Sequence, residues 1–226
     1  MMKKIVLPIL LLLLVTLIVL AKDSSSHLIF GKGTLNKESL GSSFGDELKD
    51  GDLIFQTSRS SQSKAIQLAT NSKYSHCGIV FKEGDSFYVF EAVQPVKRTP
   101  LAEWVARGEK GEFVVKRLKN AEQTLTPDMI QKMKQIGKGY NGKSYDSAFE
   151  WTDEKMYCSE LIWKIYKRAT GIEIGNLEKL GEFDLSSEVV RKKLKERYGD
   201  KIPMEELVIS PASLFESDKL VTIKAN

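Results

Sequence analysis

The hydrophobic residues in the first half of the chain fall into short runs that are typical of β-strands. Residues 75–81 (SHCGIVF) and 86–93 (SFYVFEAV) are rich in β-branched and aromatic side chains, and a Lys-Glu-Gly-Asp turn sequence separates them. We therefore expect these two runs to pair as an antiparallel hairpin. Similar apolar runs at residues 51–55 and 113–118 predict two further strands.

The second half of the chain has helical spacing instead. In its strongest helical pattern, residues 157–171, apolar side chains recur on one face, namely Cys158, Leu161, Ile162, Ile165 and Ala169. Basic residues followed by Gly171 mark the end of this helix. Weaker patterns predict helices at residues 60–70, 126–139, 186–198 and 210–215, a loop at 140–156 and a strand at 206–209.

The start of the chain has the composition of an export signal. Lys3 and Lys4 precede an unbroken apolar run at residues 5–21, and lysine, aspartate and serines follow it. Cleavage after Ala21 would leave Val19 and Ala21 at the positions where small residues are usual, and Val is an acceptable fit there. The run is also long enough to span a bilayer. We therefore expect a periplasmic or otherwise extracytoplasmic protein, in which residues 1–21 are a removed signal peptide or a membrane anchor.

The rest of the chain is predicted to be a linker followed by one domain. Residues 22–47 are rich in Ser, Gly and Lys and have little periodicity, which is typical of a linker. Residues 48–226 show no internal repeat and no change of composition, so we assign them to a single domain. The pattern of hydrophobic and polar residues is weakest in residues 172–226, to which we assign no role.

Composition and charge narrow the function classes. A hydrophobic content of 42% with a charged content of 28% indicates a globular protein with a core. The net charge is only +4, and the lysines and arginines are spread along the chain without interleaved aromatic residues. A nucleic-acid partner is therefore not expected.

Cys158 has the position of a reactive thiol. It stands at the start of the predicted helix 157–171, where unpaired backbone N–H groups and the positive end of the helix dipole favour a thiolate. The alternative is that Cys158 is simply the first apolar residue of the buried stripe, since cysteine is often a plain hydrophobe.

His76 is the candidate base for this thiol. The chain has 2 histidines, and the other, His27, lies in the predicted linker. A hairpin turn at residues 83–84 would place His76 opposite Glu91. A turn at residues 84–85 would place the two on a diagonal of the same face. A base oriented by a carboxylate is what nucleophilic catalysis requires, although a His–Glu pair at a sheet edge can also be structural.

The second cysteine is expected to take no part in the site. Alternation along a strand places Cys77 on the face opposite to His76. If His76 faces a cleft that contains Cys158, then Cys77 faces away from it, and the two cysteines are not joined in a disulfide.

Other chemistries lack their motifs. Zinc sites need about four ligands with pairs at short spacing, and the sequence has no CxxC or HxxxH. There is also no GxSxG serine elbow and no phosphate-binding glycine loop. We therefore expect neither a metal nor a cofactor.

These residues resemble a known family. The segments GDLIFQTSRSSQS, SHCGIVF, FYVFEAV, FEWTDEKMYCSEL and VISPASLF are similar to those of the circularly permuted NlpC-type papain-like cysteine hydrolases, the YiiX/YaeF group. In that family the histidine strand precedes the cysteine helix, as His76 precedes Cys158 here. The resemblance covers residues 51–215.

The resemblance implies a papain-like α+β fold in which an antiparallel sheet packs against the helix that carries Cys158. It also implies amidase or peptidase activity, with Cys158 as nucleophile, His76 as base and Glu91 as the group that orients His76. Tyr145 is similar to an aromatic residue that helps to hold the oxyanion in relatives, although a packing role fits it as well. Ser144 replaces the usual proline before it.

The substrate expected from this resemblance is a small peptide, an amino-acid amide or a peptidoglycan-derived peptide. Two alternatives stay open. The same scaffold serves lipid acyltransferases and phospholipases, for which a membrane association through residues 5–21 would be useful. A non-catalytic wall-binding module could also keep the fold, because a fold does not determine its function.

Overall fold

The computed structural model describes residues 47–225, which belong to one compact unit of the chain. The predicted signal or anchor at residues 1–21 lies outside the described residues, as does the predicted linker at 22–47 except for Glu47. None of the helices in the described part of the chain has the length and hydropathy that a membrane crossing requires.

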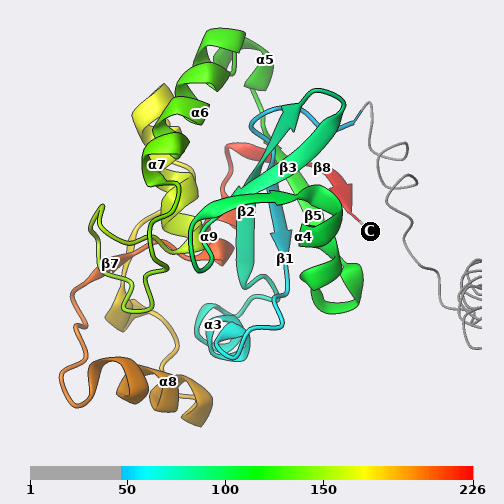
Figure 1. Ribbon diagram of the computed structural model, residues 1–226. Helices are drawn as coiled ribbons and strands as arrows, with labels where there is room; N and C mark the ends of the chain where they lie inside the picture. Colours follow the sequence, from blue (N-terminus) through cyan, green and yellow to red (C-terminus); the bar gives the residue numbers. More distant parts are fainter. Residues whose placement is uncertain (1–46, 226) are drawn as a thin grey trace, which may run out of the picture. The chain divides into compact units, whose positions relative to one another are not determined.

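A six-stranded sheet forms the centre of this unit (Figure 1), and all its neighbouring strands are antiparallel. Its spatial order is β4 (Lys97–Pro100), β3 (Ser86–Glu91), β2 (His76–Glu83), β1 (Leu53–Gln56), β5 (Val114–Leu118) and β8 (Leu220–Ala225). A separate two-stranded sheet joins β6 (Glu178–Lys179) and β7 (Leu207–Val208). Strands β4, β6 and β8 were not predicted from the sequence, because their runs are short or carry charged residues.

Seven α-helices occur among the described residues: α3 (Ser63–Thr70), α4 (Leu101–Arg107), α5 (Ala121–Thr124), α6 (Pro127–Tyr140), α7 (Cys158–Thr170), α8 (Glu188–Tyr198) and α9 (Pro211–Glu216). Short 3₁₀ segments add η1 (Glu109–Gly111) and η2 (Leu180–Glu182). Five of these α-helices match the predicted ones to within a few residues. Helices α4 and α5 were not predicted.

The hairpin between β2 and β3 has one of the two predicted registers. Glu83 pairs with Ser86, so residues 84–85 form the loop. Gly84 adopts a φ of +57°, a left-handed conformation that glycine accepts without strain. In this register His76 and Glu91 lie on a diagonal of the same face.

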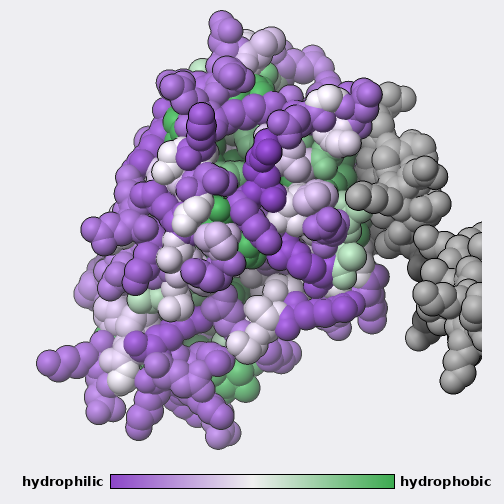
Figure 2. Space-filling view, viewed as in Figure 1, coloured by the Kyte–Doolittle hydropathy of each residue, from purple (hydrophilic) through white to green (hydrophobic). Residues whose placement is uncertain are grey.

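Strand alternation gives the sheet two buried faces. On one face, Phe55, Cys77 and Ile79 belong to a core cluster that also contains Leu161 and Ile165 of α7. The other face has its own core cluster, which contains Ile54, Val80 and Val89 of the sheet and Trp104 of α4. The fold is therefore α+β, with an antiparallel sheet packed against the helix that begins at Cys158, as expected. The outer surface shown in Figure 2 is mostly hydrophilic.

Candidate active site

Cys158 is the first residue of α7. Its helix begins after Tyr157, which has extended backbone angles and donates its N–H to the Glu160 carboxylate at 3.3 Å. The backbone N–H groups of the first turn have no partner within the helix, so the Cys158 side chain lies where a negative charge is stabilised. The thiol is almost completely buried, with 3% of the residue exposed.

His76 and Glu91 form a buried ion pair beside this thiol. The Nε2 atom of His76 lies 2.6 Å from Oε2 of Glu91, and the glutamate is fully buried. Because Nε2 is bound to the carboxylate, Nδ1 is the ring nitrogen left for Cys158. Burial lowers the pKa of His76, but the hydrogen bonds and negative charges of Cys158 and Glu91 raise it to about 9.

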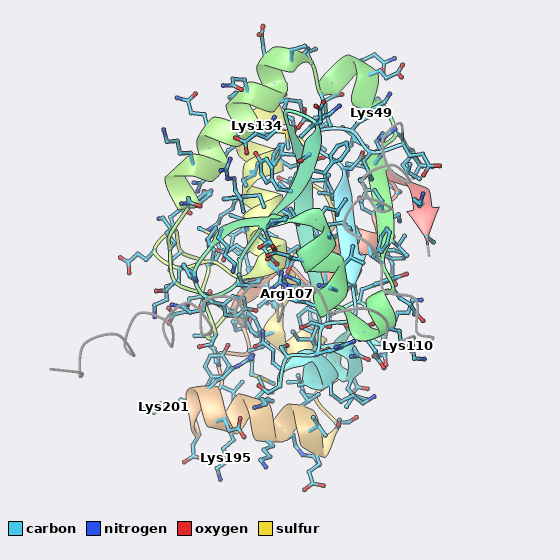
Figure 3. All side chains as sticks on the ribbon, turned by 45° about the vertical axis from the view of Figure 1, so that its right-hand side comes forward. Lys49, Arg107, Lys110, Lys134, Lys195 and Lys201 are labelled. Carbon is cyan, nitrogen blue, oxygen red and sulfur yellow. The ribbon has the colours of Figure 1, made fainter. Side chains whose placement is uncertain are left out.

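Three residues that the sequence did not single out hold this pair. Thr99 Oγ1 donates to Glu91 Oε1 at 2.6 Å, and Arg107, labelled in Figure 3, donates to the same oxygen. Burial raises the pKa of Glu91, but His76, Thr99 and Arg107 together bring it below its usual value. The Trp104 ring stacks on the imidazole, with centroids 5.8 Å apart and planes at 24°.

The signal for these supporting residues was present in the sequence. A proline followed by apolar residues at helical spacing, Leu101, Trp104 and Val105, is a typical helix start. Helix α4 indeed occupies this segment and ends at Arg107. The pattern predicts the helix, but it contains no sign that the helix lies against His76.

The Cys158 thiol is ionised more readily than an ordinary cysteine. A hydrogen bond from the Cys77 thiol is the largest influence that lowers the pKa of Cys158. Burial opposes it, and the hydrogen bond and positive charge of His76 and the Cys77 backbone N–H lower the pKa further, to well below its usual value. The site therefore favours a thiolate beside an imidazolium, which is the reactive form of a cysteine nucleophile.

The expectation that Cys77 faces away from Cys158 is wrong. Alternation does place Cys77 on the sheet face opposite to His76, but that face is the one covered by α7. His76 is the first residue of β2, and its side chain is hydrogen-bonded to Glu91. Both cysteines are free thiols, and both are buried.

Tyr145 also lies in the site. The loop before α7 is held by a bridge between Tyr145 and Met156, and the Tyr145 N–H donates to Gln94 Oε1 at 2.7 Å. Its hydroxyl accepts a 2.7 Å hydrogen bond from Gln62 Nε2. Burial first, and then the negative charge at Cys158, raise the pKa of Tyr145 far above its usual value. The hydroxyl thus keeps its proton, which it can donate to an oxyanion.

A largely apolar cavity adjoins Cys158. It lies between α3, α8 and the segment around β7, and its lining includes Ala65, Ile66, Phe149, Val190, Leu194 and Cys158. Tyr145 and Gln62 also line it, and Lys193 and Arg197 of α8 bring positive charge to it. Residues 172–226, to which the sequence pattern assigned no role, therefore supply part of the lining of this cavity.

Comparisons with known proteins identify the family to which this fold belongs. Residues 47–224 match the family described as permuted papain-like amidase enzymes, YaeF/YiiX. The chain is 54% identical to the YiiX protein of Escherichia coli (strain K12) over 173 residues, which cover 76% of this chain and 84% of the relative. It also resembles the crystal structure of YiiX from Escherichia coli O157:H7, with a TM-score of 0.76, 51% identity and coverage of 80% of this chain and 98% of the other.

The Escherichia coli O157:H7 protein is described as a metalloprotein. Between residues 47 and 225 of the present chain, no group of three or more His, Cys, Asp and Glu side chains is arranged to hold a metal ion. The described residues thus do not fit a metal centre, and we assign no step of the reaction to one.

Proposed function

Because this chain belongs to the family of permuted papain-like amidases of the YaeF/YiiX type, a class of cysteine hydrolases, we propose that it cleaves an amide bond through a thioester at Cys158. His76 serves as the general base and Glu91 orients it. The observation that supports these roles best is the buried contact of 2.6 Å between His76 and Glu91 beside the first residue of α7.

The reaction follows from these positions. His76 holds the proton of Cys158, and the thiolate attacks the amide carbonyl carbon to form a C–S bond. The Cys158 backbone N–H and the Tyr145 hydroxyl stabilise the negative charge on the carbonyl oxygen by donating hydrogen bonds to it. The imidazolium then protonates the leaving amine as the C–N bond breaks. His76 finally activates a water molecule, which hydrolyses the thioester and releases the acid.

We propose amino-acid amides, small peptides or peptidoglycan-derived peptides as the substrates. The amide chemistry of the family supports this class, and the apolar cavity beside Cys158 offers a place for an apolar side chain of the acyl part. Purified residues 22–226 should be assayed against muropeptides, amino-acid amides and phospholipids in parallel, with the Cys158→Ala variant as the blank. Turnover of none of them by a protein whose Cys158 also fails to react with iodoacetamide would support a binding module instead.

One observation favours a second candidate. A cavity lined mainly by apolar side chains also suits a fatty acyl chain, as the lipid acyltransferase or phospholipase alternative requires. Mass spectrometry after incubation with phospholipid distinguishes the two. An acyl group on Cys158 together with turnover of phospholipid but not of amides would replace the amidase proposal.

We further propose that the domain works outside the cytoplasmic membrane, either released or tethered by residues 5–21. The support is the basic and then apolar start of the sequence. A reporter that is active only in the cytoplasm, fused after residue 226, should be silent. Activity of that reporter would contradict export.

A further inference from the structure

The Tyr145 hydroxyl is held by a chain of hydrogen bonds that begins outside its own loop. Gln62 donates an Nε2 hydrogen to this hydroxyl at 2.7 Å, and Oε1 of the same amide accepts a hydrogen bond from Arg197 Nη2. The three residues are far apart in the sequence, because Gln62 precedes α3, Tyr145 precedes α7 and Arg197 is in the last turn of α8. All three line the cavity that Cys158 also lines.

The packing of α8 brings Arg197 to this place. Helix α8 lies against α3 (Figure 1), and the Arg197 guanidinium lies over the Phe149 ring, 4.4 Å from its centroid. The next residue, Tyr198, donates its hydroxyl hydrogen to the Ala148 carbonyl. Two separate contacts therefore hold the last turn of α8 on the loop that carries Tyr145.

Gln62 uses its side chain for these contacts and not for its own helix. It occupies the N-cap position of α3, but its side chain makes no capping hydrogen bond. Both ends of the amide are bound instead, the nitrogen to Tyr145 and the oxygen to Arg197.

Arg197 determines which way round this amide lies. A guanidinium has only donors, so the amide atom that faces it must be the oxygen. The amide nitrogen then faces Tyr145, where it can only donate, so the phenol oxygen must accept. The phenol cannot give its own proton to Gln62 and has it available for another acceptor. With the amide reversed, Tyr145 would be the donor, and its proton would point away from the substrate.

We propose that Gln62 is a positioning residue that acts through Tyr145: held in one orientation by Arg197, it keeps the phenol proton directed at the oxyanion of the substrate. This role rests on the proposed function of Tyr145 as an oxyanion donor. It gives α8 a part in the reaction, although α8 carries none of the residues that touch the reacting atoms.

Gln62→Glu reverses the hydrogen bond while keeping the shape of the side chain. The new carboxylate can still accept from Arg197, but it can also only accept from Tyr145, so it takes the phenol proton away from the substrate. We expect kcat to fall about 100-fold with KM nearly unchanged, as in Tyr145→Phe. Steady-state kinetics on an amide that the wild-type chain turns over measure this and the following variants.

Gln62→Ala should cost less than Gln62→Glu. It removes the partner of Tyr145 but leaves the phenol proton available, so we expect kcat to fall only about 3- to 10-fold. A purely structural role predicts the opposite order, because alanine loses more packing than glutamate does. Arg197→Met should also lower kcat about 3- to 10-fold, because the amide can then reverse.

A double variant separates this effect from simple repulsion between negative charges. In the Tyr145→Phe background there is no phenol proton to redirect, so Gln62→Glu should lower kcat by less than about threefold more. Gln67→Glu, which adds the same charge elsewhere on α3, is the matched control and should keep wild-type kcat. Thermal unfolding identifies the variants that are folded.

The outcomes distinguish this proposal from the ones on which it rests. Equal losses in Gln62→Ala and Gln62→Glu, or a full further loss in the double variant, would overturn it. Wild-type kcat in a folded Gln62→Glu variant, when Tyr145→Phe is slow, would do the same. Unchanged kcat in Arg197→Met would contradict the orienting role of Arg197. Wild-type kcat in Tyr145→Phe would contradict the oxyanion role itself, and Cys158→Ala tests the nucleophile separately.

Discussion

His76 and Glu91 are diagonal neighbours across the hairpin, yet Nε2 and Oε2 lie 2.6 Å apart. Each residue stands where the β2–β3 ladder has just ended, since the last regular pair is Ile79 with Phe90. Gly78 lies beside Glu91 on this face, and a Cβ there would be 3.5 Å from the Glu91 Cβ. The missing side chain of Gly78 leaves the space in which His76 and Glu91 meet. Because this contact uses Nε2, only Nδ1 of the imidazole remains available to Cys158.

Substitutions in the proposed triad should have graded effects. Cys158→Ala should abolish turnover and His76→Ala should lower kcat/KM by about 10⁴-fold or more, because the first removes the nucleophile and the second its proton acceptor. Glu91→Gln should cost about 10- to 1,000-fold, because an amide can still hold the imidazole by one hydrogen bond. Steady-state kinetics on any accepted substrate measure the series.

Glu83→Gln is a suitable control for this series. Glu83 lies on the same hairpin but is exposed and paired with Arg98, so its loss should leave kcat/KM unchanged. Turnover by Cys158→Ala would show that another group is the nucleophile. An unchanged rate in Glu91→Gln would assign the orienting role to another residue.

The pH profile of kcat/KM should be bell-shaped. Activity should rise with pH as the Cys158 thiol, with its lowered pKa, ionises, and it should fall above about pH 9 as His76 loses its proton. Glu91→Gln removes a negative charge that raises the pKa of His76, so the alkaline limb should move to lower pH. An alkaline limb that stays in place in this variant would contradict the coupling of His76 with Glu91.

Thr99→Val should weaken the site without disturbing its shape. The change removes the hydroxyl that donates to Glu91 Oε1 at 2.6 Å, and valine fills nearly the same volume. We expect the pKa of Glu91 to rise and kcat/KM to fall about tenfold. Thr222→Val on the exposed part of β8 is the control and should have wild-type kinetics. Equal rates in both variants would mean that Thr99 does not support the carboxylate.

Tyr145→Phe tests the proposed oxyanion donor. The phenol accepts a hydrogen bond from Gln62, so its own proton is available to substrate, and its loss should lower kcat about 100-fold with little change in KM. Tyr140→Phe is the control, because the Tyr140 hydroxyl is bound by Arg168. If both variants keep wild-type kcat, Tyr145 has only a packing role.

Stability should depend on the contact between α7 and the sheet. Ile165 is fully buried in the core on this face, so Ile165→Ala should lower the free energy of unfolding by about 2–5 kcal/mol and Ile165→Val by about 0.5–1.5 kcal/mol. Val221→Ala, at an exposed position, should change it by less than about 0.5 kcal/mol. Chemical denaturation measures all three. Similar losses for Ile165→Ala and Val221→Ala would contradict this assignment of the core.

The sequence by itself determined the local geometry of the site. The turn composition at residues 82–85 limited the hairpin to two registers, and both place His76 and Glu91 on one face. The apolar stripe that begins at Cys158 determined where α7 starts, because helical periodicity depends only on near neighbours. These relationships span few residues and follow from the repeat of a strand or a helix.

Only the tertiary structure decided how these local elements meet. Alternation states that His76 and Cys77 point to opposite faces, but not which face α7 covers, and the wrong choice hid that Cys77 and Cys158 share one buried core cluster. Likewise, Thr99 and Arg107 reach Glu91 because β4 and α4 fold back over the hairpin. Such contacts depend on how separate elements pack against each other, and the periodicity within one element carries no information about its packing partner.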